Sequence, residues 1–498
     1  MKFIKLFFFL LLLQILQAQT VGDTPPLPIQ STDIYKNSNM YQQDFLYLCE
    51  GLIEFHVNVF MNFPKEEFNK QKETYYEQLA RCKNENEFGK IANKFISQIK
   101  DGHAGVAINE TAGKNFIYPF RCKYLVDTLV IMAVSDQLPF SLCGERIKSI
   151  NGIPIMDIEK RASLVYPTEN YVSLQNYIML RINSTEYLKS IEVIHSDTES
   201  VKITTYSGKE FEASPNFNGI WKSEISTKVL ITEKQSDPFT YKIVKEKSLC
   251  YIQMNGMVDR RIGEMYLDML PFWQRWGIKT WGFFGGSDGI PEVYFDEFLN
   301  TCIEDIEKNN IKKVIIDLRW NYGGNFIPGN ILLYALGVDK YKGFSADINV
   351  SELSKLQRGN LESVKNTTDA NDPSNNYYYT NSTKWTENIK KRFNGDVYFI
   401  TSEWTFSSAV LLATIVKDNH LFKVVGEPIR ERPSHFGDVL FLKLPNSKNI
   451  CTLSYKLFHR PDKSKDNDET LYPDVTIYKT YDDIKNGIDR VYEWIAAQ

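Results

Sequence analysis

The chain has 498 residues, with 58 basic and 62 acidic side chains and a formal net charge of -4. Nucleic acid is not expected as a partner, because its binding needs concentrated positive charge. Hydrophobic residues make up 43% and charged residues 24% of the chain, which excludes a wholly disordered, collagen-like or coiled-coil protein. This length predicts roughly two to four domains.

Residues 1–18 have the pattern of a secretory signal peptide. Lys2 and Lys5 flank an apolar run from Phe7 to Leu13, and Ala18 offers a small residue for cleavage. The run is shorter than the about 20 residues that span a bilayer. We therefore expect no stable membrane span and a soluble protein that is secreted or held in a lumen of the secretory pathway, extracellular or lysosome-like.

Cysteines and glycosylation sequons fit this route. Cys49 with Cys82, and Cys122 with Cys143, are close enough in sequence for local disulfides, and the odd total of seven leaves at least one thiol over. No Cys-x-x-Cys pair occurs, so structural zinc is not expected. No other metal and no cofactor is expected either. Sequons for glycosylation begin at Asn109, Asn183, Asn349, Asn366 and Asn381.

A linker and a helical domain come next along the chain. Residues 19–37 are rich in Pro, Gln and Ser, as linkers are. Residues 38–105 predict a helical domain, because apolar residues recur there every three or four positions, as at Phe88, Ile91, Phe95 and Ile99. This domain ends in Asp101-Gly102-His103.

Residues 115–215 predict a compact β-rich module. Short runs of β-branched and aromatic residues are separated by turn signals, among them Asn151-Gly152 between two short apolar runs. An Asn-Gly pair between strands favours a tight hairpin turn.

Residues 245–480 alternate between strand and helix patterns, which predicts an α/β core with parallel strands. Such sheets bind ligands beyond the carboxyl ends of their strands, where the loops 319–325 and 401–408 are expected. Residues 340–392 are polar and read as a surface insertion. The predicted strands are Leu249–Met254, Val314–Leu318, Val397–Thr401 and Phe422–Gly426, and the predicted helices are Val293–Ile306 and Ser407–Lys417.

Two features at these loops have the chemistry of a hydrolase. Ser407 and Ser408 stand where a helix begins, so backbone N–H groups and the helix dipole favour an oxyanion there. The alternative is that either serine only caps the helix. Gly323-Gly324 allows a close backbone approach to an oxyanion, and the alternative is a tight turn.

A general base is expected among six histidines. His103 follows an Asp-Gly pair at a domain edge, and His435 lies in the loop after Gly426. Either imidazole titrates near neutral pH and is suited to the role. The alternative for each is an ordinary surface or core histidine.

Several motifs in this order resemble the C-terminal-processing (tail-specific) and tricorn-type serine peptidases. Asp317-Leu-Arg-Trp-Asn-Tyr-Gly-Gly324 is similar to their strand-loop motif, and Thr405-Phe-Ser-Ser-Ala409 to their nucleophile helix. Asp101-Gly-His103 is similar to the segment that supplies histidine in the tricorn-like branch. The stretch Cys143–Ile158 resembles the core of a PDZ domain.

The resemblance implies a crotonase-like (ClpP/crotonase superfamily) α/β peptidase core with an N-terminal helical domain and a β-rich PDZ-like domain. It also implies a peptide or protein substrate and leaves the oligomeric state open. The implied roles are Ser407 as nucleophile, His103 as general base, Ser408 with Gly323 or Gly324 as the oxyanion hole, and Asp466, Asp468 or Glu469 as the acid that orients His103.

Two departures from the family pattern keep other functions open. Arg432 stands where the tail-specific branch has a lysine, and an arginine cannot act as a base. Val410 stands where a glutamate is often found. The main alternative is therefore an inactive ligand- or peptide-binding protein, similar to the retinoid-binding proteins of the photoreceptor matrix. A pure protein-interaction module rests on the PDZ-like segment alone.

Overall fold

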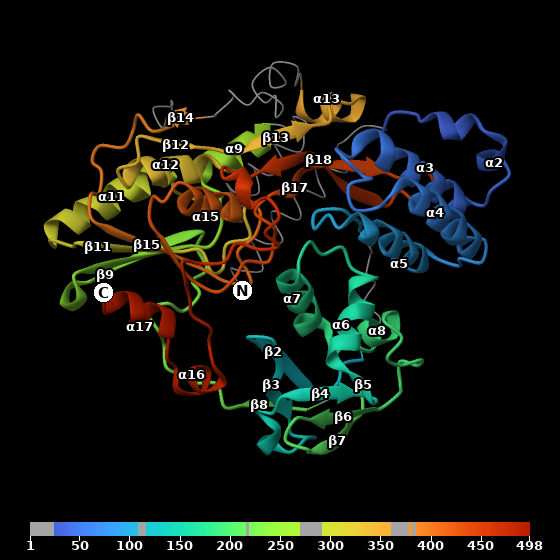
Figure 1. Ribbon diagram of the computed structural model, residues 1–498, viewed down its shortest axis with the longest axis horizontal. Coiled ribbons are helices and arrows are strands. Elements are labelled where there is room, and N and C mark those ends of the chain that lie inside the picture. The colour runs from blue at the N-terminus through green and yellow to red at the C-terminus, as the bar shows by residue number, and fades with distance from the viewer. Residues whose placement is uncertain (1–23, 108–115, 216–218, 269–290, 360–377, 381–384) are drawn as a thin grey trace, which may run out of the picture.

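The computed structural model describes residues 24–107, 116–215, 219–268, 291–359, 378–380 and 385–498 (Figure 1). The predicted signal peptide and the sequons at Asn109, Asn366 and Asn381 lie outside the described residues. Within those ranges, no helix combines the length and the apolar character that crossing a membrane requires.

The first described segment is helical. Asn39 and Asn84 begin two of its helices, because their side chains accept hydrogen bonds from N–H groups of the first turn. The aromatic side chains of Phe45, Phe68 and Phe95 pack edge to face in its core. The elements are α2 (Asp33–Lys36), α3 (Met40–Phe55), α4 (Lys65–Leu79), α5 (Glu85–Ile96) and the short strand β1 (Gly105–Val106).

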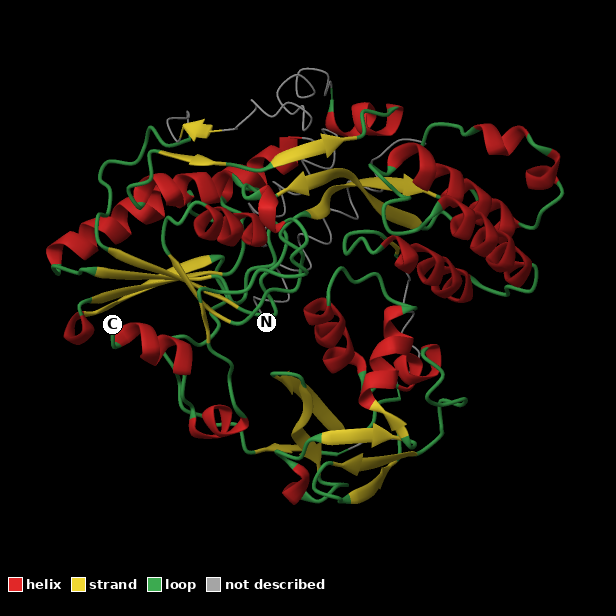
Figure 2. Ribbon diagram, viewed as in Figure 1, coloured by secondary structure: helices red, strands yellow, loops and turns green. Residues whose placement is uncertain are grey.

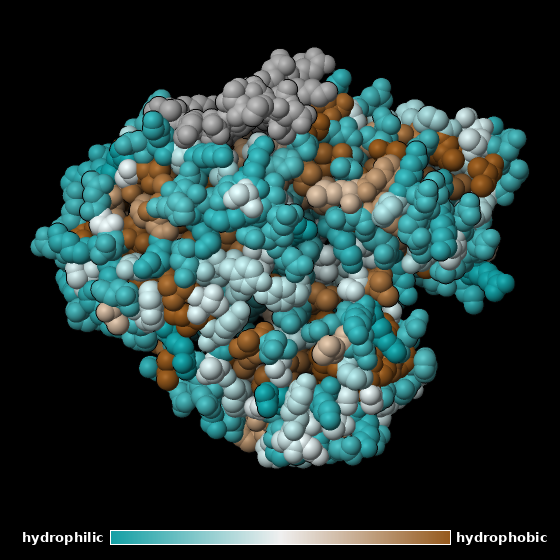
Figure 3. All heavy atoms as spheres, in the orientation of Figure 1, coloured by the Kyte–Doolittle hydropathy of each residue, from teal (hydrophilic) through white to brown (hydrophobic). Residues whose placement is uncertain are grey.

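A lower lobe in Figure 1 holds two small antiparallel sheets and three helices. Asn151 and Gly152 both have positive φ angles, 50° and 76°, so the predicted Asn-Gly turn joins β4 to β5. The elements are β2 (Phe120–Leu125), β3 (Thr128–Ser135), β4 (Ile147–Ile150), β5 (Ile153–Pro154), α6 (Ile155–Ser163), α7 (Tyr171–Arg181), α8 (Thr185–Ser190), β6 (Val201–Thr205), β7 (Glu210–Ala213) and β8 (Trp221–Ser223). Brown apolar surface gathers on this lobe near its junction with the upper body (Figure 3).

The main body contains a six-stranded sheet in the order β19-β16-β15-β11-β10-β9. All neighbours are parallel except β9 and β10, so the predicted mixed α/β core is confirmed. The strands are β9 (Phe239–Val244), β10 (Leu249–Met254), β11 (Lys313–Asp317), β15 (Asp396–Thr401), β16 (Lys423–Gly426) and β19 (Val475–Thr476).

Helices cover both faces of this sheet (Figures 1 and 2). Val314 and Ile316 of β11 pack in the core beneath α11, α12 and α15, whereas Ile315 between them faces α17. This alternation follows from the two-residue period of a strand. The helices are α9 (Arg260–Asp268), α11 (Phe295–Lys308), α12 (Ile327–Ala335), α15 (Ser408–Asp418), α16 (Tyr481–Asn486) and α17 (Arg490–Ala496).

A second sheet joins the helical segment to the body. The hairpin of β17 (His435–Lys443) and β18 (Ile450–His459) pairs with β1 on one side of β18 and with β13 (Ser345–Ile348) further along it. Leu440 and Leu453 of the hairpin share a core with the helices α3 and α5. The predicted insertion therefore contributes a strand to a sheet, and it also contains β12 (Lys340–Lys342), α13 (Glu352–Arg358) and β14 (Tyr378–Thr380).

The seven cysteines are free thiols in the structure, so neither of the two predicted local disulfides is present. The sulfur atoms of Cys250 and Cys302 lie 3.7 Å apart in the core between β10 and α11. Nearness in sequence was the wrong criterion, because a disulfide requires two Cβ atoms to face each other across a short gap.

Candidate active site

Two loops meet at one edge of the main sheet. Strands β11 and β15 are parallel neighbours, so the loops 318–326 and 402–407 leave the sheet on the same side. The hydroxyl groups of Ser402 and Thr405 donate to backbone carbonyls of the first loop at 2.8 and 3.0 Å. The loops are thus held together directly in front of α15.

Charged and amide side chains of the first loop fix its shape. Arg319 pairs with Asp317 at 2.6 Å and with Asp489, just before α17, at 2.7 Å, and all three are buried. Asn321 donates to the carbonyl that ends β10 and accepts the N–H of Gly323 at 2.9 Å. These residues position the glycine pair and do not reach the reacting atoms.

Ser407 has a backbone conformation that favours a functional role. Its φ of 53° and ψ of -127° lie in a region that residues with a Cβ rarely adopt. It occupies the position before α15, yet its side chain makes no capping hydrogen bond. The alternative of a simple helix cap therefore does not describe Ser407, and its hydroxyl is available to another partner.

That partner is His103, whose Nε2 lies 3.4 Å from Ser407 Oγ. The N–H of His103 donates to Asp101, and its carbonyl accepts the hydroxyl of Thr452, each at 2.8 Å. The imidazole stacks on Phe406 with ring centroids 4.8 Å apart and is 12% exposed. Burial lowers the pKa of His103, against the raising effect of the Asp101 charge, so the ring is neutral at neutral pH.

Glu431 is the acid that faces this histidine. Its Oε1 lies 3.4 Å from His103 Nδ1, and its Oε2 accepts the N–H of Ser407 at 2.7 Å. Both His103 Nδ1 and Glu431 Oε1 are buried without a hydrogen-bond partner. A small movement of either side chain toward the other would therefore form a hydrogen bond between these two atoms. Burial, and then the charge of Glu169, raise the pKa of Glu431 well above its ordinary value.

The three acids expected from the family order lie elsewhere. Asp468 pairs with the buried Arg460 at 2.8 Å. Asp466 accepts a hydrogen bond from the hydroxyl of Ser434, and the backbone carbonyl of Glu469 accepts one from Asn170. None of the three contacts His103, because this stretch is tied to neighbouring loops instead.

Gly323 and Gly324 fit closely against the nucleophile loop. A Cβ on Gly323 would lie 2.7 Å from Cβ of Ser407, and both glycines have positive φ angles. The hydroxyl of Ser408 donates to the carbonyl of Gly324 at 2.6 Å. The N–H of Gly323 is taken by Asn321, whereas among the described residues the N–H groups of Gly324 and Ser408 have no partner.

His435 is near the site but has a different environment. Its Nδ1 lies 3.0 and 3.1 Å from the carbonyls of Pro433 and Arg432, so that nitrogen carries the proton. Burial, and then repulsion from His103, lower the pKa of His435 to about 3. Its ring stacks near His103 at 6.3 Å and has no hydrogen bond to Ser407.

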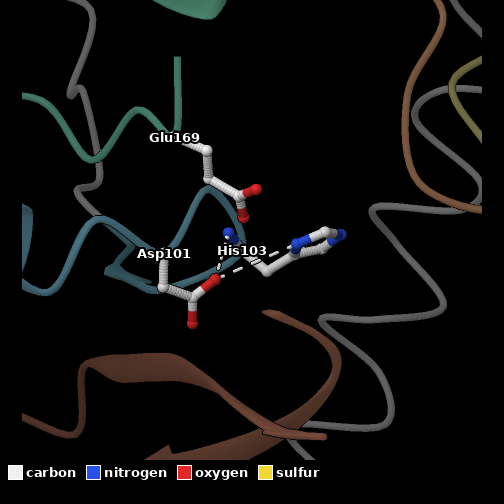
Figure 4. A group of neighbouring side chains, drawn as sticks. All are labelled: Asp101, His103 and Glu169. Carbon is white, nitrogen blue, oxygen red and sulfur yellow. Dashed lines mark hydrogen bonds and ion pairs between the residues drawn. The ribbon is translucent and has the colours of Figure 1, made fainter. Parts of the chain in front are cut away.

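One trio of metal-ligand type lies at the site, formed by Asp101, His103 and Glu169 (Figure 4). Three of its four carboxylate oxygens already accept hydrogen bonds, from His56, His103 N–H and Gly102 N–H. The trio is therefore an acid cluster that orders the segment around His103, and the donor set does not favour a cation.

A cavity of about 1100 Å³ opens beside His103. Its wall comes from the helical segment, the helices α7 and α8, the strands β17 and β18, and Phe406. An open cleft of this size accommodates several residues of an extended peptide.

Sequence reasoning missed Glu431 and its neighbour Arg430. Both lie in the loop after β16, and β16 is the parallel neighbour of β15. This loop therefore leaves the sheet at the same edge as the other two. Knowing that β16 lies next to β15 would have pointed to this loop as part of the site, whereas the sequence around Arg430 and Glu431 carries no motif.

Comparisons with known proteins identify the fold. Residues 290–477 match the sequence profile of peptidase family S41. The crystal structure of mature CPAF is 14% identical, covers 93% of this chain and 96% of its own, and superposes with a TM-score of 0.57. Mature CPAF complexed with lactacystin is 13% identical, with coverages of 94% and 98% and a TM-score of 0.55. No curated protein matches the chain.

Proposed function

Since residues 290–477 form a peptidase family S41 domain and the chain is a serine-type peptidase, we propose that it is a secreted endopeptidase with Ser407 as nucleophile and His103 as general base. The family acts on peptides or proteins, which sets the substrate class. The observation that carries the proposal is the 3.4 Å approach of His103 Nε2 to the uncapped hydroxyl of Ser407. Such a pair is the signature of an activated serine.

The reaction follows from this geometry. Ser407 Oγ attacks the peptide carbonyl as His103 Nε2 accepts its proton, and the carbonyl oxygen becomes an oxyanion. His103 then gives the proton to the leaving amine, which leaves Ser407 as an ester. A water molecule, deprotonated by His103 in the same way, hydrolyses the ester and restores the serine.

The free N–H groups of Gly324 and Ser408 support their role as the oxyanion hole. Preorganised backbone donors stabilise the developing charge without reorganising during the reaction. Gly323 is less suited as a donor because Asn321 already holds its N–H. Because Gly323 has no side chain, the loop that carries Ser407 can pack closely against it.

Glu431 is the positioning acid of this proposal. When His103 accepts a proton, its Nδ1–H needs an acceptor, and Glu431 Oε1 is the unpartnered atom in front of it. A carboxylate there fixes the tautomer and stabilises the imidazolium. The N–H of Ser407 donates to the same carboxyl, which ties the base and the nucleophile to one group.

The finer description of the fold is part of the proposal. The sheet and helices of residues 245–480 support a crotonase-like core, and the β-rich lobe with the turn at Asn151 supports a PDZ-like module that captures a peptide by strand addition. Secretion rests on the charged and apolar pattern of residues 1–18. An inactive binding protein is not favoured, because such a protein has no need of a strained serine facing a neutral histidine.

The test is labelling by a fluorophosphonate together with cleavage of a peptide library. The wild-type protein is expected to react, and Ser407→Ala to lose both activities. His103→Ala should lower kcat by about 10²–10⁴-fold, whereas His435→Ala should cost far less. An inactive His435→Ala protein beside a fully active His103→Ala protein would overturn the mechanism. Expression with and without residues 1–18 tests secretion.

A further inference from the structure

The cavity beside Ser407 contains a guanidinium group without a counter-ion. Arg430 lines the cavity and is partly buried, and its Nε atom is buried without a hydrogen-bond partner. Within the part of the chain that the structure describes, this guanidinium makes no hydrogen bond and no ion pair. Withdrawing part of a cation from water without a counter-charge is unfavourable, so this position favours an anion supplied from outside the chain.

The neighbouring acid does not neutralise Arg430. Glu431 follows it in the sequence, but the carboxyl group of Glu431 is directed at the N–H of Ser407 and at His103. Glu431 therefore makes no ion pair with Arg430, although the charge of Glu431 raises the pKa of Arg430 and so partly offsets the effect of burial.

A second arginine of the cavity shares this property. Arg181 ends α7 and places its guanidinium 3.9 Å from the ring centroid of Tyr177. Across the described ranges it, too, has no acidic partner. Burial, and to a smaller extent the charge of Arg181, lower the pKa of Arg430, so the two cations lie within electrostatic range of each other.

The cavity wall as a whole is basic. Its only lining acids among the described residues are Glu169 and Glu186, and Glu186 is paired with Lys90 at 2.8 Å. A cleft lined by one sign of charge concentrates ligands of the opposite sign. The basic residues of the wall are Lys90, Lys94, Arg181, Arg430, Lys443 and Lys448.

The position of Arg430 relates this charge to the reaction. The ring of Phe406 contacts both groups, with its centroid 4.8 Å from the ring of His103 and 4.7 Å from the guanidinium of Arg430. A side chain or chain end close to the bond attacked by Ser407 therefore reaches Arg430. We propose that Arg430, with Arg181 in the same cavity wall, binds a carboxylate of the peptide substrate and thereby sets specificity.

This inference rests on the proposed function for its substrate class, but its test does not require cleavage. Full-length Ser407→Ala protein is titrated by calorimetry with a hexapeptide series. One Glu is moved along each peptide, each is paired with its Gln analogue, and each is made with a free and an amidated C-terminus. Hydrogen bonds to charged groups contribute about 1.5–3 kcal/mol, so we expect a carboxylate at one position to tighten binding about tenfold or more.

Two variants in the same background identify the group responsible. Arg430→Met should abolish the preference, and Arg430→Lys should restore part of it. Arg121→Met is the matched control, because Arg121 also stacks on an aromatic ring, Trp221 at 4.1 Å, but lies outside the cavity wall. This control should keep the full preference.

The outcomes separate the two sources of the carboxylate. A Glu preference that ignores amidation assigns an acidic side chain, and a loss of binding on amidation assigns the α-carboxylate of the peptide. The proposal is overturned if the protein prefers neither a Glu side chain nor a free C-terminus. It is also overturned if Arg430→Met weakens the binding of Glu and Gln peptides equally. If the Ser407→Ala protein binds the peptides selectively but the wild-type protein does not cleave them, the proposed function fails while this inference stands.

Discussion

Ser407 combines chemical and conformational demands in one residue. Its left-handed backbone angle costs of order 1–3 kcal/mol for a residue with a Cβ, and the contacts around it sustain this strain. The loop before it is bonded to the neighbouring loop, its N–H is held by Glu431, and a glycine at 323 leaves room for its side chain. Stability is thus reduced where reactivity is needed.

We predict that Ser407→Ala abolishes peptidase activity, whereas Ser408→Ala keeps a good part of it. Only the N–H of Ser408 is needed for an oxyanion, and alanine retains it, although the bond from the Ser408 hydroxyl to Gly324 is lost. Steady-state cleavage of one peptide by both variants decides the matter. Full activity in Ser407→Ala protein would reject the assignment.

Ser407→Gly provides a second test at the same position. Both Ser407→Ala and Ser407→Gly remove the hydroxyl, but only glycine relieves the strain, so Ser407→Gly should be the more stable by about 1 kcal/mol. Thermal unfolding of the two inactive proteins measures this difference. Equal melting temperatures would show that the backbone is not strained.

The pH profile tests the roles of His103 and Glu431. Activity requires His103 without its proton, and burial lowers the pKa of His103, so kcat/KM should rise with pH below the ordinary imidazole value of about 6.5. Glu431 must also be ionised, and burial raises the pKa of its carboxyl well above the ordinary value. This second ionisation therefore shifts the rising limb to higher pH, and the logarithmic slope should exceed one at low pH. Glu431→Gln should lower kcat about a hundredfold or more and reduce the slope to one.

A rising limb only above about pH 9 would indicate a lysine-like base instead. A slope of one in both proteins would show that Glu431 takes no part. Arg432→Ala serves as the control and should leave the limb in place, because the side chain of Arg432 donates to the carbonyl of Asp466 and makes no hydrogen bond or ion pair with His103 or Glu431.

At the scale of elements, a partly buried charge cluster joins the β-rich lobe to the nucleophile loop. Lys123 of β2 contacts Glu403, four residues before Ser407, at 2.7 Å. Burial opposes ionisation, yet Lys123 lowers the pKa of Glu403 to about 2. Burial, and then the charge of Glu403, raise the pKa of the adjacent Glu427 to about 7. Lys123 therefore links the lobe to the loop that carries Ser407, beside the hydrogen bond that Asn176 of α7 donates to the carbonyl of Glu403.

We predict that Lys123→Met lowers both stability and kcat, because it leaves the partly buried carboxyl groups of Glu403 and Glu427 without the nearby cation. The matched control is Lys202→Met, which removes an exposed pair with Glu210 and should change little. Melting temperature and kcat are measured for both. A stable and active Lys123→Met protein would show that the lobe and the loop are independent.

Glu427 predicts a pH dependence of stability with a definite sign. Its pKa is higher in the folded than in the unfolded chain, so its contribution is full below about pH 4.5 and is lost as the pH rises through about 7. Glu427→Gln should therefore gain a few degrees in melting temperature relative to wild type on going from pH 5 to pH 8. A constant difference across that range would contradict the burial of an ionisable Glu427.

At the scale of the whole molecule, the site is assembled from distant parts of the chain. His103 and Ser407 are 304 positions apart, and the loop that carries Gly323 depends on Asp489 through Arg319. We predict that Asp489→Ala removes activity and lowers the melting temperature, because the buried Arg319 loses one of its two acids. Asp482→Ala, an exposed acid nearby, is the control and should behave like wild type.

The sequence predicted the core well and the charged contacts poorly. Continuous apolar runs predicted the ends of β10, β11 and β15 to within one residue. A strand that is buried on both faces is apolar at successive positions, so its sequence shows where it begins and ends. Ser407 and His103 were named through a resemblance, and the structure brings them together. Glu431 was missed and acids at 466–469 were expected, because which carboxyl meets a histidine depends on how loops fold back, and no local pattern records that.

The ion pair between Arg319 and Asp489 has a consequence for the order of events in biosynthesis. The base at 103 is synthesised first, the nucleophile at 407 much later, and the residue that secures the glycine loop later still. A nascent chain that has not yet reached residue 489 lacks one of the two acids that hold Arg319. The Asp489→Ala prediction therefore implies that the proposed active site is completed only after residue 489 has been synthesised.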